Sequence, residues 1–82
     1  MTKELIHKAI DYATSNEEDL KNSELAACYY CKSIFKASEV KEFLETERTA
    51  LCPKCGIDSV LPSNSPIELT TENLVELNKH WF

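Results

Sequence analysis

The sequence predicts a small α+β domain in which helices at both ends flank a hairpin of two metal-binding turns, called knuckles below. Its 82 residues suffice for a single domain, 1–82, with a thin hydrophobic core. All four cysteines and the only glycine fall between Cys28 and Gly56, and the flanking segments carry apolar residues at helical spacing. We therefore expect a helical N-terminal part at 1–27, a two-knuckle metal core at 28–61 and a C-terminal helix at 67–82.

The cysteines form two Cys-x2-Cys pairs, separated by residues 32–51. This spacing is typical of a structural zinc site, in which each pair holds one side of a tetrahedral ion. Gly56 follows the second pair, where a positive φ lets backbone N–H groups point at the sulfurs, and Lys32 stands at the equivalent place after the first pair. The sequence predicts one Zn²⁺ per chain, with iron as the alternative metal, bound by Cys28, Cys31, Cys52 and Cys55.

The predicted ligand set indicates a structural role for the metal. A catalytic zinc keeps one coordination position open for water, whereas four thiolates close the shell. We therefore expect no enzymatic activity. The thiolates also permit a redox switch that releases the metal on oxidation, and this alternative stays open. His7 and His80 lie far from the cysteines in the sequence and are expected at the surface.

The N-terminal segment does not have the pattern of a signal peptide, because Met1–Tyr12 interleaves charged and apolar residues. No apolar run in the chain approaches the roughly 18 residues that a membrane span needs. We expect a cytoplasmic protein without membrane contact. In that compartment the cysteines stay reduced and do not form disulfides.

The charge balance is acidic, with 14 Asp and Glu against nine Lys and Arg and a formal net charge of −5. A phosphate backbone needs clustered cations, so nucleic acid is disfavoured as a partner. A protein partner with a basic surface is favoured instead, and no small-molecule substrate is evident. We therefore expect a protein-interaction or regulatory module. A nucleic-acid-binding zinc ribbon is the second hypothesis, and a rubredoxin-like iron electron carrier is the third.

Two helices are expected before the first knuckle. Thr2 can cap the first, and its apolar stripe is Leu5, Ile6, Ala9, Ile10 and Ala13. Ser15 followed by Glu18 has the pattern of a capping box, which predicts a second helix near Asn16 with Leu20 buried. That helix either breaks at Asn22 or runs on to Cys28.

Between the knuckles we expect short strands at Ser33–Lys36 and Arg48–Leu51. A short helix capped by Ser38 is expected between them, with Val40, Phe43 and Leu44 as its buried stripe. Tyr29 and Tyr30, at the tip of the first knuckle, can pack beside the metal or anchor a partner.

After the second knuckle, Leu61–Pro66 is rich in turn formers and is expected to be irregular. Thr70 or Thr71 then begins the last helix, whose apolar face is Leu74, Leu77 and Trp81. We expect Trp81 to plug the core and leave the exposure of Phe82 open.

The stretch Thr49-Ala-Leu-Cys-Pro-Lys-Cys-Gly-Ile-Asp-Ser-Val-Leu61 resembles the hallmark of a family of small, mostly uncharacterised bacterial cytoplasmic proteins. The likeness extends to the first cysteine pair, to Phe35…Glu39-Val40…Phe43 and to the ending Leu77-Asn-Lys-His-Trp-Phe82. Ala26 replaces a cysteine frequent in that family, and Leu61-Pro-Ser-Asn64 replaces its glycine-rich continuation. The resemblance implies a zinc-binding intracellular module and supplies no activity. The paired knuckles also resemble zinc ribbons and rubredoxins more loosely.

Overall fold

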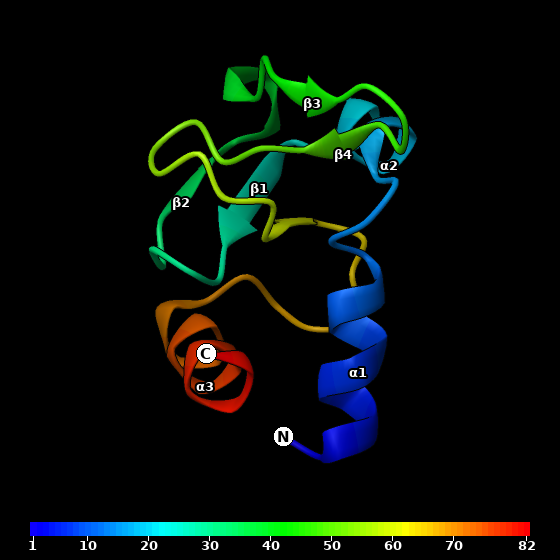
Figure 1. Cartoon of the computed structure of the whole chain (residues 1–82). Helices are drawn as coiled ribbons and strands as arrows, with labels where there is room; N and C mark the ends of the chain where they lie inside the picture. The colour runs from blue at the N-terminus through cyan, green and yellow to red at the C-terminus, as the bar shows by residue number, and fades with distance from the viewer.

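A three-stranded antiparallel sheet lies at the centre of the protein, in the computed structural model, which describes residues 1–82. Its strand order is β2-β1-β5, and a separate hairpin pairs β3 with β4 (Figure 1). The elements follow the order α1 (Lys3–Asp11), α2 (Glu17–Lys21), β1 (Leu25–Cys28), β2 (Ile34–Lys36), the 3-10 turn η1 (Ala37–Glu39), β3 (Phe43–Leu44), β4 (Thr49–Ala50), β5 (Val60–Pro62) and α3 (Thr71–Trp81). The prediction of an α+β domain is confirmed.

The sheet separates two hydrophobic cores, because successive side chains of β1 point to opposite faces. Ala27 belongs to the core beneath α1 and α3, whereas Ala26 and Cys28 belong to the core beneath α2 and the β3–β4 hairpin. In β5, Leu61 and Val60 divide in the same way. Figure 1 shows α1 and α3 on one side of the sheet and α2 with the hairpin on the other.

The helices at the two ends have the N-terminal caps that the sequence predicts. The Thr2 hydroxyl accepts from the Leu5 N–H at 3.2 Å, and the Thr70 hydroxyl accepts from the Asn73 N–H at 3.2 Å. Each cap satisfies an N–H group that has no partner within its helix. None of the helices has the length and apolar character needed to cross a membrane.

The prediction that Trp81 plugs the core is wrong. Leu77 is fully buried, one turn before the end of α3, whereas Trp81 and Phe82 are 50% and 59% exposed. The helix also begins at Thr71 and not at Ile67, which is buried in an extended segment. The last turn of α3 therefore projects beyond the core, and its two aromatic side chains face solvent over half their surface.

The expected N-terminal helical part ends early, because residues 25–28 form the central strand β1. Alanine favours helix in isolation, but pairing with strands on both sides outweighs that preference. β1 pairs Ala26 with Phe35 on one side and with Pro62 on the other.

Two further segments differ from the sequence prediction because both pair as strands. The prediction of a helix capped by Ser38 is wrong. The 3-10 turn η1 has a single turn, and the Glu39 carboxylate accepts a hydrogen bond from the Lys36 N–H at 3.0 Å. Phe43 then pairs with Ala50 in the hairpin. The segment expected to be irregular begins with β5, where Leu61 pairs with Ala27. Pro62 is tolerated there because β5 is an edge strand. The strands expected at 33–36 and 48–51 are confirmed, as β2 and β4.

The predicted capping box at Ser15 is also wrong. Ser15 adopts a φ of 49°, and its N–H donates to the buried Thr49 hydroxyl at 2.9 Å. Asn16 occupies the N-cap position of α2 but makes no side-chain cap bond there. The Asn16 side chain instead forms hydrogen bonds in the interior of the protein.

Asn16 is fully buried and joins three segments through its amide. Its oxygen accepts from the Ala50 N–H at 3.0 Å, and its nitrogen donates to the carbonyls of Tyr12 and Val60 at 3.0 and 2.8 Å. These bonds connect the end of α1 to β4 and β5. No side-chain nitrogen or oxygen in the interior lacks a partner, so this network is complete.

We expect Asn16→Ala to lower the free energy of unfolding by about 3 kcal/mol, because buried Ala50 N–H and Val60 C=O groups lose their partners. Urea denaturation of the variant measures this loss. Asn22→Ala is the matched control, since the Asn22 amide also donates to a backbone carbonyl but lies at the surface. Equal destabilisation by the two substitutions would contradict the role given to Asn16.

Candidate metal centre

The two knuckles share one backbone geometry. In the first, the Cys28 N–H donates to Ser33 O at 3.0 Å and the Lys32 N–H donates to Cys28 O at 2.8 Å. In the second, Cys52 N–H donates to Ile57 O and Gly56 N–H donates to Cys52 O, both at 2.9 Å. Lys32 and Gly56 adopt φ values of 63° and 81°. A residue other than glycine at this position must adopt either a strained φ or a looser turn, and Lys32 adopts the strained φ that a glycine accepts freely.

These turns bring all four cysteine sulfurs together. The Sγ atoms of Cys28 and Cys55 are 3.7 Å apart, as are those of Cys31 and Cys52, and the four lie within 4.8 Å of one another. A tetrahedral ion with metal–sulfur bonds of about 2.3 Å separates its ligands by about 3.8 Å, whereas a disulfide requires about 2.0 Å. The cysteines are free thiols, and their spacing fits one shared metal ion.

The four sulfurs differ in their access to solvent. Cys28, at the end of β1, and Cys52, after β4, are buried, and Cys31 is half-buried. Cys55 is exposed at the tip of the second knuckle. The cluster thus has a protected side that belongs to the core beneath the hairpin and one corner that faces solvent.

Hydrogen-bond donors surround the sulfurs. The Lys54 N–H donates to the Cys52 Sγ at 3.3 Å, and backbone N–H groups of Cys31 and Ile57 approach Cys28 and Cys55. The buried Ser59 hydroxyl lies 3.1 Å from the Cys28 Sγ. Donors of this kind stabilise thiolates.

The thiols cannot all ionise near neutral pH on their own. Burial raises the pKa of Cys28, and burial together with the neighbouring sulfurs raises the pKa of Cys55 to about 12. Burial by itself would also raise the pKa of Cys31. Hydrogen bonds with Ser33 and with the adjacent sulfurs outweigh burial and lower this pKa to about 7. Repulsion between thiolates spreads the four ionisations apart. A divalent cation at the centre removes this repulsion, so the site is suited to a metal.

A partly buried contact from α3 fixes the first knuckle. The Asn78 amide donates to the carbonyls of Tyr29 and Tyr30 at 3.1 and 3.0 Å. Tyr29 packs into the core beneath α1 and α3, whereas Tyr30 is exposed and its ring centroid lies 4.9 Å from that of Phe82. One of the two tyrosines therefore packs inward, and the C-terminal helix positions a metal-binding turn.

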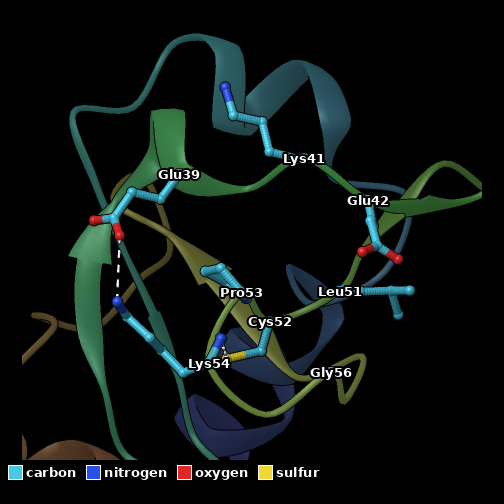
Figure 2. A pocket seen from close by; sticks show the side chains of 8 residues that line it. All are labelled: Glu39, Lys41, Glu42, Leu51, Cys52, Pro53, Lys54 and Gly56. Carbon is cyan, nitrogen blue, oxygen red and sulfur yellow. Dashed lines mark hydrogen bonds and ion pairs between the residues drawn. The ribbon is translucent and has the colours of Figure 1, made fainter.

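An open hollow of about 420 Å³ lies beside the second knuckle (Figure 2). Cys52, Pro53 and Gly56 line it, and the Lys54 ammonium lies 3.3 Å from the Glu39 carboxylate across it. The Lys36 backbone N–H and the Lys54 ammonium lower the pKa of Glu39. The hollow is lined by both acidic and basic side chains, and solvent screens its exposed ion pair. The ion pair connects the second knuckle to η1 across the hollow.

The structure does not bring the histidines to the cysteines. His7 on α1 and His80 on α3 are exposed, with ring centroids 6.1 Å apart. The group of side chains placed to hold a metal contains cysteines alone. The expectation that both histidines lie at the surface is confirmed.

Sequence reasoning missed Ser59 and Asn78 as parts of the site. Ser59 follows the second knuckle in the sequence, but its hydroxyl reaches a sulfur of the first knuckle. Asn78 lies 49 residues from Tyr29 in the sequence. No local pattern marks either residue, because both contacts depend on the folded arrangement of distant segments.

No family model, curated protein or solved structure matches the chain. The family resemblance of the cysteine motif therefore stays a prediction. The case for a metal centre depends on the geometry of the four sulfurs.

We expect Ser59→Ala to weaken metal binding by about tenfold or more, because the Cys28 thiolate loses a buried donor. Competition with a chromophoric chelator measures this loss. Ser33→Ala is the matched control: the Ser33 hydroxyl lies 3.4 Å from the half-buried Cys31 sulfur, so a smaller loss is expected. A Ser33 effect equal to that of Ser59 would contradict the importance of burial.

Proposed function

We propose that the protein is a zinc-stabilised, non-catalytic protein-interaction or regulatory module of the cytoplasm. The convergence of four cysteine sulfurs at the spacing of a tetrahedral site is the observation that carries this proposal. We further propose that the paired knuckles act as a zinc-ribbon or rubredoxin-like unit, because the two turns repeat the same hydrogen bonds.

The donor set supports a structural zinc ion. Four thiolates suit zinc or iron in tetrahedral geometry, and they leave no coordination position for a substrate or an activated water. Free thiols are stable in a reducing compartment, which supports the cytoplasm as the place of function.

The metal is expected to supply much of the stability. A chain of this length buries only about 60–65% of its unfolded surface. Structural zinc contributes about 10–16 kcal/mol of apparent binding free energy, comparable with the whole net stability of a domain at about 5–15 kcal/mol. Since Cys28 and Cys52 belong to one of the two cores, loss of the ion disrupts packing as well as the turns.

The charge distribution supports a basic protein partner. The formal charge is −5, and four thiolates around a divalent ion lower it by about two more. Arg48 and Lys54 near the knuckles are already paired with Glu17 and Glu39. The remaining Lys and Arg side chains are too few and too scattered to bind along a phosphate backbone.

We expect the purified chain to contain one zinc ion, and Cys52→Ser to abolish cooperative thermal unfolding, because a neutral hydroxyl is a poor zinc ligand. Native mass spectrometry with elemental analysis gives the metal, and circular dichroism gives the melting curve. Ser38→Ala serves as a surface control with an unchanged melt. A red, iron-containing protein or a cooperative melt of the Cys52 variant would contradict the prediction.

We expect no specific binding to DNA or RNA at about 150 mM salt, where screening removes the few available phosphate contacts. Fluorescence-anisotropy titration with single- and double-stranded probes tests this. The zinc-loaded protein is the reagent, and a basic nucleic-acid-binding domain is the positive control. Submicromolar, sequence-dependent binding would overturn the proposed function in favour of a nucleic-acid-binding zinc ribbon.

A further inference from the structure

A second hollow, called the α2 groove, lies between α2 and η1 on the side of the sheet that carries the knuckles. Its volume is about 310 Å³. Its floor is apolar and combines residues from α2, from η1 with its C-cap and from β3: Leu20, Ala37, Val40 and Phe43. The volume falls at the lower end of the range for binding pockets, about 300–1,000 Å³, and suits one large side chain.

The rim of the α2 groove is acidic. Glu17 lines it, with Glu18 and Asp19 next to it on α2. Glu24 follows the lining residue Ser23, and its carbonyl accepts from the N–H of Ala37 on the floor. Glu45 acts electrostatically on Arg48, whose guanidinium lies over the Phe43 ring, 5.2 Å from its centroid. Glu17 and Lys21 are the charged residues that line the groove, and acidic residues outnumber basic ones on the segments beside it.

Two of the cations near the groove, Lys21 and Arg48, are already engaged, whereas Lys36 and Lys41, next to the lining residues Ala37 and Val40, form no ion pair. Arg48 Nε donates to a Glu17 carboxylate oxygen at 3.1 Å, and the Lys21 ammonium lies 3.8 Å from Glu18. Neither Glu24 nor Glu45 forms an ion pair within the chain. An excess of carboxylates beside an apolar hollow favours a ligand that is basic at its flanks and apolar at its centre.

We propose that the α2 groove is the docking site for a basic segment of a partner protein, which places one apolar side chain on the floor of the groove. This inference rests on the proposed interaction function and deepens it by naming the surface and the chemistry of the partner. The negative rim attracts the segment at long range, and burial of its apolar side chain holds it. The carboxylates of Glu24 and Glu45 pair with its flanking cations.

The test is a nuclear magnetic resonance titration of the zinc-loaded, nitrogen-15-labelled full chain at about 150 mM salt. The probe is a short synthetic peptide with a central leucine flanked by lysines and arginines. We expect saturable binding below about 1 mM, with the largest shifts at the amides of Leu20, Ser38 and Phe43. Replacing the leucine of the peptide by glycine should raise the Kd at least about tenfold.

Two double variants separate the groove from net charge. Glu24→Lys with Glu45→Lys should raise the Kd at least about fivefold. Glu4→Lys with Glu68→Lys makes the same change of net charge on the side of α1 and α3 and should raise the Kd less than about twofold. Thermal melting of both variants establishes that each is folded.

Three results would overturn the assignment: no saturable binding by about 1 mM, shifts that map to another face, or equal losses in the two double variants. Shifts on another face would remove the groove but leave the interaction function in place. Failure of the interaction function itself would appear separately, as tight binding in the nucleic-acid titration.

Discussion

Mutual repulsion of four thiolates is the constraint on which the rest of the structure depends. The backbone holds the sulfurs at the separation of ligands around a single ion, 3.7 Å for two of the pairs. At that distance the ionised groups disfavour one another strongly unless a cation lies between them. The fold therefore concentrates donors on the sulfurs and buries two of the four cysteines. The donors stabilise individual thiolates, and a divalent metal at the centre would balance the charge of all four.

The cluster also ties together parts that share few other contacts. Cys28 ends the central strand of the sheet, and Cys52 follows the separate β3–β4 hairpin. A metal bound to both joins the two sheets across the core beneath the hairpin. The Asn16 amide makes the same connection by hydrogen bonds to Ala50 and Val60. One polar network and one candidate metal centre thus hold the hairpin to the sheet from two sides.

The features predicted from the sequence are those with local causes. Thr2 and Thr70 cap helices through N–H groups three residues away, and the cysteine spacing marks two turns of fixed geometry. β1 and β5 could not be predicted in this way, since Ala26 is extended only because Phe35 and Pro62 pair with it. The spacing of Val40, Phe43 and Leu44 fits a helix, but Phe43 and Leu44 form a strand that pairs with β4. Ser59 and Asn78 reach the site through tertiary contacts that leave no sequence pattern.

The alternation of side chains along β1 connects the metal centre to the far side of the molecule. Cys28 faces the core beneath the hairpin, and Tyr29, the next residue, faces the core beneath α1 and α3. The Tyr29 carbonyl accepts from Asn78, so the same peptide segment is held by a candidate metal ligand and by the C-terminal helix. Tyr29 lies in the turn that follows β1, and Asn78 donates to the carbonyls of Tyr29 and Tyr30 in that turn. The C-terminal helix is therefore held against a metal-binding turn, although α3 contributes no ligand.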